Sequence, residues 1–187
     1  MQLSSPPRTL TVPTIEPIVL RDGSVATLRL AQASDRDAMH GFFRDLSPAS
    51  RYTRFFTPGE PSDAVIDRFC DSSNPKRRST LLATRTVTSQ PRIVGVASYF
   101  RMDESTAEVA FAVDDRLHGK GIATAMLKRL AALAANSGFT QLWATTLSDN
   151  RAMMDVFRDS GFPIRSNLGC IDVVLSLTPS AERVRIH

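Results

Sequence analysis

The chain has 187 residues, of which 42% are hydrophobic and 22% are charged, with 9 glycines and 11 prolines. This composition is typical of one globular domain and excludes a disordered or fibrous chain. The net charge of +4 comes from scattered basic residues. It favours neither a nucleic acid nor a small polyanion as the partner.

Cysteine and histidine placement argues against several kinds of site. Cys70 and Cys170 lie far apart, which disfavours a disulfide framework or a clustered thiolate site. The three histidines show no ligand spacing with cysteines or carboxylates, so we expect no metal.

Residues 1–17 have no signal-like apolar run, and no segment reaches the roughly 18 apolar residues of a membrane span. We therefore expect a cytoplasmic protein without a membrane partner.

Polar ends flank the predicted domain. Residues 1–16 are rich in Ser, Thr and Pro and predict a flexible arm, residues 17–178 the domain, and residues 179–187 a tail. The domain opens with β-prone runs at 18–20 and 25–30 around an Asp-Gly turn, which predicts a hairpin.

Two helices are predicted after the hairpin from apolar residues at helical spacing. The first runs from about Ser34 to Leu46, and the second, short one opens at Ser62 and continues through Phe69. Between them, Ser47 and Pro48 predict a turn.

The remaining elements follow in a regular order. Residues 80–87, 93–102 and 106–113 are β-rich and predict an antiparallel meander. A helix from Ile122 to Ser137 and a strand at 139–146 then complete a strand-helix-strand unit. A fourth helix at 152–159 and a last strand at 171–177 give an α/β (α+β) fold with about four helices.

The most informative segment is the loop between the strand 106–113 and the helix that begins at Ile122. Gly119 and Gly121 permit backbone conformations and close approach that a Cβ would block, and the first N–H groups of the helix face whatever lies over the loop. Such a loop is suited to bind phosphate, and a tight turn from strand to helix with no ligand is the alternative interpretation of two glycines alone. It is not a Walker loop, because Ile122 follows Gly121, and it lacks the third glycine of the dinucleotide fingerprint, since Thr124 stands there.

Two motifs resemble the GNAT superfamily of N-acyltransferases. Arg116-x-x-Gly119-x-Gly121 resembles the pyrophosphate loop of that superfamily, and the segment from Asn150 to Gly161-Phe162 resembles its Asn and terminal Gly-Phe motif. The resemblance implies a mixed, mostly antiparallel sheet whose central strands splay apart. Leu20-Arg21-Asp22-Gly23 and the segment 46–56 further resemble the branch that contains bacterial protein-lysine acetyltransferases.

The resemblance implies acetyl-CoA as co-substrate and assigns its site. The backbone of Phe111 and Val113 would pair with the pantetheine, the side chains of Arg116 and Lys120 would add positive charge, and Asn150 would contact the cofactor from the facing element. The backbone amides of the loop and first helical turn would bind the pyrophosphate, and they belong to His118, Gly119, Lys120, Gly121, Ile122, Ala123 and Thr124.

Acyl transfer to a lysine needs a base, because its ammonium has a pKa near 10.4. Glu108 stands where the protein-lysine acetyltransferases of the superfamily have their general base, and an inward-facing Glu108 in this apolar strand would be desolvated. A solvent-facing glutamate is the alternative. The tyrosine that serves many members as general acid is replaced by Phe157; Tyr99 and Tyr52 are possible substitutes, more simply explained as packed or rim residues.

These features predict an acetyl-CoA-dependent N-acetyltransferase that acts by direct attack in a ternary complex. Its expected acceptor is a primary amine, in the first instance a protein lysine side chain. A small-molecule amine acetyltransferase is one alternative, and a non-catalytic acyl-CoA-sensing module, suggested by Phe157, is another. Nucleic-acid binding is disfavoured, because the chain lacks the interleaved aromatic and basic residues of a recognised module.

Overall fold

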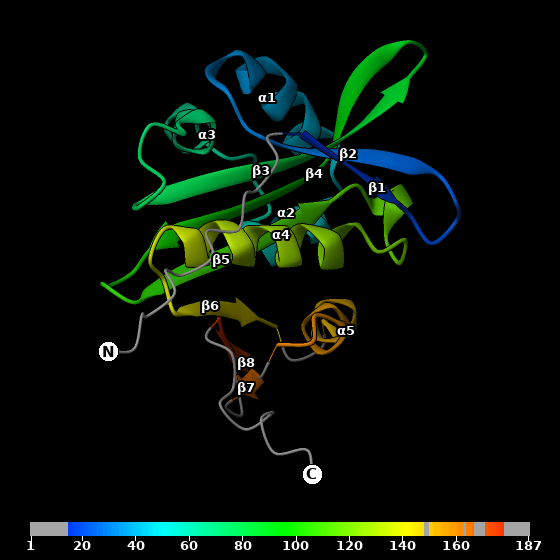
Figure 1. Ribbon diagram of the computed structural model, residues 1–187. Helices are drawn as coiled ribbons and strands as arrows, with labels where there is room; N and C mark the ends of the chain where they lie inside the picture. Colours follow the sequence, from blue (N-terminus) through cyan, green and yellow to red (C-terminus); the bar gives the residue numbers. More distant parts are fainter. Residues whose placement is uncertain (1–14, 148–149, 163, 167–170, 178–187) are drawn as a thin grey trace, which may run out of the picture.

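The computed structural model describes residues 15–147, 150–162, 164–166 and 171–177 (Figure 1). These residues form one eight-stranded sheet with the order β1-β2-β3-β4-β5-β6-β8-β7. Its strands are β1 Ile15–Val19, β2 Val25–Leu30, β3 Arg78–Val87, β4 Gln90–Arg101, β5 Thr106–Val113, β6 Gln141–Thr146, β7 Ile164–Ser166 and β8 Ile171–Ser176.

Strand pairing confirms the predicted hairpin, meander and strand-helix-strand unit. Strands β1 to β5 pair in chain order, each antiparallel to the next. The chain then crosses over through a helix, and β6 pairs parallel with β5, while β8 and β7 complete the sheet in antiparallel pairing. The sheet is therefore mixed and mostly antiparallel.

Five α-helices are present in the described residues, one more than predicted. They are α1 Arg36–Asp45, α2 Pro48–Phe55, α3 Asp63–Cys70, α4 Ile122–Asn136 and α5 Arg151–Asp159. The additional helix is α2, which occupies the segment after the predicted turn: Ser47 caps it by accepting a hydrogen bond from the Ser50 amide, and Pro48 lies in its first turn. No helix in the described part of the chain is long and apolar enough to cross a membrane.

The ends of the domain differ slightly from the prediction. Strand β1 begins at Ile15, inside the predicted arm. The short strand β7 was not predicted. The rest of the arm and the tail from residue 178 lie outside the described residues, as do Cys170 and His187.

Two apolar clusters pack on opposite faces of the sheet. One lies between the sheet and α4 and includes Tyr99, Phe111 and Phe157. The other packs α1 and α3 against the opposite face and includes Phe43, Phe69 and Ala112. Figure 1 shows α4 lying across one side of the sheet, with α1 and α3 on the other. Consecutive residues of β5 therefore face different layers.

The central strands β5 and β6 separate, as the resemblance implied. Their ladder has three pairs and ends where Glu108 pairs with Trp143, while β5 continues to Val113. The Asp114 amide donates to the Val94 carbonyl of β4 (2.9 Å). Alternation along the strand then turns the backbone groups of Phe111 and Val113 away from β4, toward the gap.

Candidate active site

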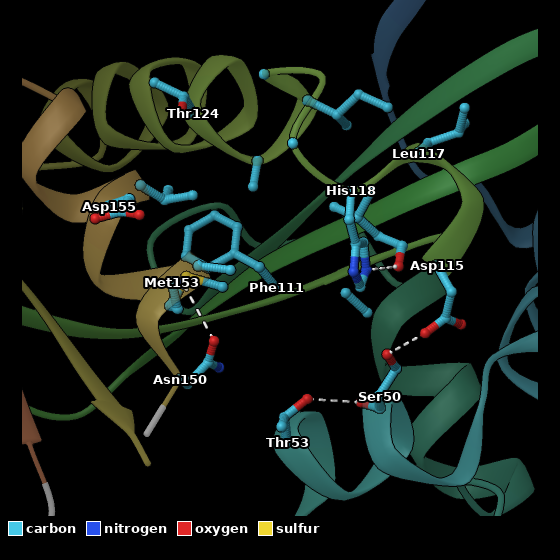
Figure 2. A pocket seen from close by; sticks show the side chains of 18 of the residues that line it. Ser50, Thr53, Phe111, Asp115, Leu117, His118, Thr124, Asn150, Met153 and Asp155 are labelled. Carbon is cyan, nitrogen blue, oxygen red and sulfur yellow. Dashed lines mark hydrogen bonds between the residues drawn. The ribbon is translucent and has the colours of Figure 1, made fainter. Parts of the chain in front are cut away.

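A cavity of about 410 Å³ lies where β5 and β6 separate. Phe111, Ala112 and Val113 of β5 contribute one wall, and the glycine loop with the start of α4 contributes another. Helix α2 lines the cavity with Ser50 and Thr53, and α5 lines the opposite side. In Figure 2, Phe111 lies in the middle, with Thr124, Met153 and Asp155 on one side and Ser50 and Thr53 on the other.

The glycine loop has the backbone geometry that an anion site requires. Gly119 and Gly121 adopt positive φ values of 74° and 89°. Gly121 is the N-cap of α4, and no side chain in the described residues caps this helix. The N–H groups of its first turn, at Ile122, Ala123 and Thr124, therefore have no intrahelical partner and are available to a bound group. All three residues line the cavity, and their predicted contact with a pyrophosphate stays a prediction.

The structure pairs each of the two predicted cationic side chains with an aspartate. Arg116 and Lys120 do not line the cavity. The Arg116 guanidinium makes two hydrogen bonds to Asp114 (2.9 and 2.6 Å), and Arg116 in turn lowers the pKa of that carboxyl. Lys120 forms an ion pair with Asp22 (2.8 Å). An aspartate offsets each charge, and the predicted contribution of the two side chains to anion binding stays a prediction.

The turn between β1 and β2 supports the glycine loop. The Arg21 amide donates to the Lys120 carbonyl (3.0 Å), and the Arg21 guanidinium donates to the Gly119 carbonyl (3.4 Å). The same side chain forms an ion pair with Asp159 at the end of α5 (2.9 Å). Arg21 and Asp159 both line the cavity, a placement the sequence motif did not predict.

Asp115 joins the cofactor side of the cavity to α2. Its carboxylate accepts hydrogen bonds from the Ser47 amide (3.0 Å), the Ser47 hydroxyl (2.8 Å) and the Ser50 hydroxyl (2.6 Å). Partial burial would raise the pKa of Asp115, but the hydrogen bonds from Ser50 and Ser47 outweigh it and lower the pKa. This carboxylate also lies at the N-terminus of α2, where the helix dipole favours a negative charge.

His118 contacts the end of β5. Its Nε2 lies 2.9 Å from the Val113 carbonyl oxygen (Figure 2). Because a carbonyl only accepts, the ring carries a proton on Nε2. The His118 side chain thereby uses the Val113 carbonyl and leaves the Val113 N–H for another acceptor. His118, Phe111 and Val113 line the cavity, and their predicted cofactor contacts stay predictions.

Glu108 does not have the burial that the sequence suggested. It is exposed and lies outside the set of residues that line the cavity. It shares the α2 side of β5 with Ala112, which does line the cavity, four residues or about 13 Å along the strand. The expected desolvation is wrong because strand alternation points Glu108 away from the α4 layer, so any proton transfer requires a long acceptor side chain or an intervening water.

None of the three aromatic residues weighed in connection with the general acid lines the cavity. Phe157 is buried in the core beneath α4. Tyr99 is fully buried, and its hydroxyl donates to the Pro75 carbonyl (2.6 Å); burial raises its pKa. Tyr52 is exposed on α2. Asn150 does line the cavity, where its Oδ1 accepts a hydrogen bond from the Met153 amide (3.1 Å) and caps α5.

Comparison with known proteins identifies the family. Residues 26–163 match the acetyltransferase (GNAT) domain family. The chain belongs to the GNAT family. An acetyltransferase of Pseudomonas aeruginosa is 29% identical to it over 145 residues, which are 76% of this chain and 77% of the relative. The chain is thus an acetyl-CoA-dependent N-acetyltransferase.

Solved GNAT structures have the same fold. The GNAT domain of S. lividans PAT superposes with a TM-score of 0.77 at 29% identity, covering 87% of this chain and 96% of that one. A Salmonella typhimurium protein solved with its cofactor acetyl-CoA gives 0.65 at 18% identity, covering 83% and 96%. A cAMP-binding acyltransferase from Mycobacterium smegmatis gives 0.61 at 21% identity and covers 89% of this chain but 48% of that one. The latter two likenesses support the fold alone.

Other reactive side chains are sparse in the described part of this GNAT chain. No group of three or more His, Cys, Asp or Glu residues there is arranged to hold a metal ion. Cys70 is buried, and desolvation raises the pKa of its thiol. A thiol with a raised pKa is a poor nucleophile at neutral pH.

Proposed function

We propose that this GNAT enzyme acetylates lysine side chains of proteins and that Glu108 is its general base. Among the relatives, S. lividans PAT supports a protein acceptor, because its GNAT domain, that of a protein acetyltransferase, matches this chain at 29% identity over nearly the whole domain. The residues that resemble the protein-lysine branch support it independently.

The observation that carries the proposal is the open acceptor side of the cleft. Helix α2 lines the cavity through Ser50 and Thr53, while Tyr52 and Phe56 of the same segment are 45% and 47% exposed. Exposed aromatic side chains beside a reaction cleft suit contact with a protein surface, since they bury large areas with few rotatable bonds. Glu108 is exposed on the same side of the sheet, and a long lysine side chain, with a water where needed, would bridge the distance from the cavity to it.

Acetyl-CoA, when bound, supplies a thioester: the acceptor nitrogen bonds to the carbonyl carbon, the C–S bond breaks, and the sulfur leaves as thiolate or takes up a proton. The uncapped start of α4 would hold the pyrophosphate. The Val113 N–H, turned toward the gap, would donate to the carbonyl oxygen as its negative charge grows. Glu108 would accept the proton that the lysine ammonium must lose before its nitrogen can attack.

An acceptor screen with labelled acetyl-CoA tests the proposal. Cell-extract proteins and a panel of small amines are incubated separately with the wild-type enzyme and with Glu108→Gln. We expect label on discrete proteins, at lysine, that depends on Glu108. Transfer to small amines alone would replace the protein acceptor with a small molecule. Binding of acetyl-CoA without transfer to either group would favour the acyl-CoA-sensing alternative.

A further inference from the structure

Arg54 is half-buried on the acceptor side of the molecule, with its guanidinium turned inward to the sheet. It is carried by α2, and its guanidinium donates to the hydroxyl of Ser98, a fully buried residue of β4 (2.9 Å). The guanidinium carbon lies 4.9 Å from the ring centre of Phe55 and 5.1 Å from that of Phe69. Two aromatic faces and one hydroxyl therefore fix the position of this cation.

The Arg54 guanidinium has an unused donor. Its Nε is buried and has no hydrogen-bond partner in the described part of the chain. A buried donor without a partner is costly, more so on a charged group, so a nearby acceptor is expected to approach it. Burial lowers the pKa of Arg54 to about 10, and the Glu108 carboxylate acts in the opposite direction. Arg54 thus remains charged at neutral pH.

The strand register places Arg54 beside Glu108. Ser98, which anchors the guanidinium, pairs with Ala110 of β5, and the next rung on the same side of the sheet pairs Phe100 with Glu108. Ser98 and Glu108 are therefore diagonal neighbours, whose backbones are typically about 7–8 Å apart. A long side chain anchored at Ser98 can reach across that distance. Glu108 is exposed, so its carboxylate is free to turn toward the cation.

We propose that Arg54 is a positioning residue: its fixed guanidinium attracts the Glu108 carboxylate and holds it at the acceptor side of the cleft. This inference rests on the proposed function, in which Glu108 is the base. Without Arg54, the carboxylate samples solvent-facing positions, and fewer of them are in line with the entering amine. A misplaced catalytic group lowers turnover without weakening the binding of acetyl-CoA at the distant glycine loop.

Arg68 offers a matched control. Its guanidinium carbon also lies over a ring of this layer, 4.8 Å from the centre of Phe100. Arg68 is exposed on α3, however, so water screens its charge. Arg54→Met and Arg68→Met each remove one guanidinium from an aromatic contact, and only the first removes the buried charge anchored at Ser98.

A double-mutant cycle tests the inference with full-length protein. Arg54→Met, Arg68→Met and Glu108→Gln are made alone, and the first two also in the Glu108→Gln background. We expect Arg54→Met to lower kcat by about 10- to 100-fold with little change in KM for acetyl-CoA. In the Glu108→Gln background the same change should have less than about a twofold effect, whereas Arg68→Met should have little effect in either background.

Different failures give different results. If Glu108→Gln leaves kcat unchanged, the base assignment is wrong and the inference falls with it. If Glu108→Gln slows turnover but Arg54→Met lowers kcat equally in both backgrounds, Arg54 acts on the fold and the positioning role alone is wrong. Should Arg54→Met fail to fold, Ser98→Ala removes only the anchoring hydroxyl and should give a smaller loss of kcat that again disappears in the Glu108→Gln background. An undiminished loss in that background would overturn the inference.

Discussion

Gly121→Glu should abolish most acetyl-CoA binding. Gly121 is the N-cap of α4 with φ of 89°, and a Cβ built there meets only Arg21 at an ordinary 3.6 Å. The substitution is therefore not blocked by a clash within the protein, and its effect on the ligand is electrostatic and steric. A carboxylate about 5 Å from a phosphate charge, at an effective dielectric constant of about 20–40, costs about 2–3 kcal/mol. That lowers affinity by roughly 30- to 150-fold.

The same substitution at the other end of the helix is the control. Gly138 follows α4, has φ of 97° and has no atom within 4 Å of a built Cβ. Gly121→Glu and Gly138→Glu both force a non-glycine residue into the left-handed region, which costs about 1–2 kcal/mol and lowers Tm by about 2–8 °C. Calorimetric titration with acetyl-CoA well below Tm separates binding from stability. Equal affinities for the two folded variants would refute the pyrophosphate site at this loop.

Three further substitutions test individual groups. Glu108→Gln should lower kcat by about 10²–10⁴ at neutral pH with unchanged acetyl-CoA affinity. The loss should shrink as pH approaches the lysine pKa of about 10.4. A pH series of steady-state rates checks both expectations, and normal turnover at neutral pH would exclude Glu108 as the base. Asp115→Ala removes three hydrogen bonds from a partly exposed carboxylate, worth about 1–2 kcal/mol together, and should lower Tm by about 2–8 °C. Because folding lowers the pKa of Asp115, the stability that its carboxylate contributes is complete above about pH 4 and is lost as pH falls through the pKa of Asp115 in the folded protein. The Tm values of variant and wild type should therefore converge in acid. A Tm difference that stays constant with pH would contradict the stabilising role of the ionised carboxylate. Phe157→Tyr should change kcat by less than about tenfold. It should lower Tm, because it buries a hydroxyl in the core. A hundredfold gain in rate would show that the wild-type chain lacks a needed general acid.

Elements with a strong local signal were predictable from sequence. Helix α4 has a long apolar face and a glycine at each end, and β3 to β5 are β-rich runs separated by turn residues. The glycine loop was predictable for the same reason, since positive φ values at Gly119 and Gly121 are local requirements. Helix α2 was missed because its eight residues are too few for periodicity to outweigh the turn signal of Ser47 and Pro48.

The charge balance of the site was not predictable from spacing. Lys120 is paired with Asp22, which belongs to the first hairpin, and only the folded chain brings the two together. The exposure of Glu108 depends on which layer covers each side of β5, a property of the whole sheet. Arg54 belongs to a motif that was noted for its resemblance, but its partner Ser98 is on another strand, and no local pattern indicates that contact.

The contacts of Arg21 and Asp22 have a consequence for the choice of fragment boundaries. The family match covers residues 26–163, whereas the turn that holds the glycine loop precedes residue 26 and β8 follows residue 163. A fragment trimmed to the matched range would retain every glycine of the loop yet lack β1, the Arg21 and Asp22 contacts, and the six-residue pairing of β6 with β8. A truncation intended for binding studies or crystallisation should therefore begin no later than β1 and end no earlier than β8. The residues that support the glycine loop lie outside the range that matches the family.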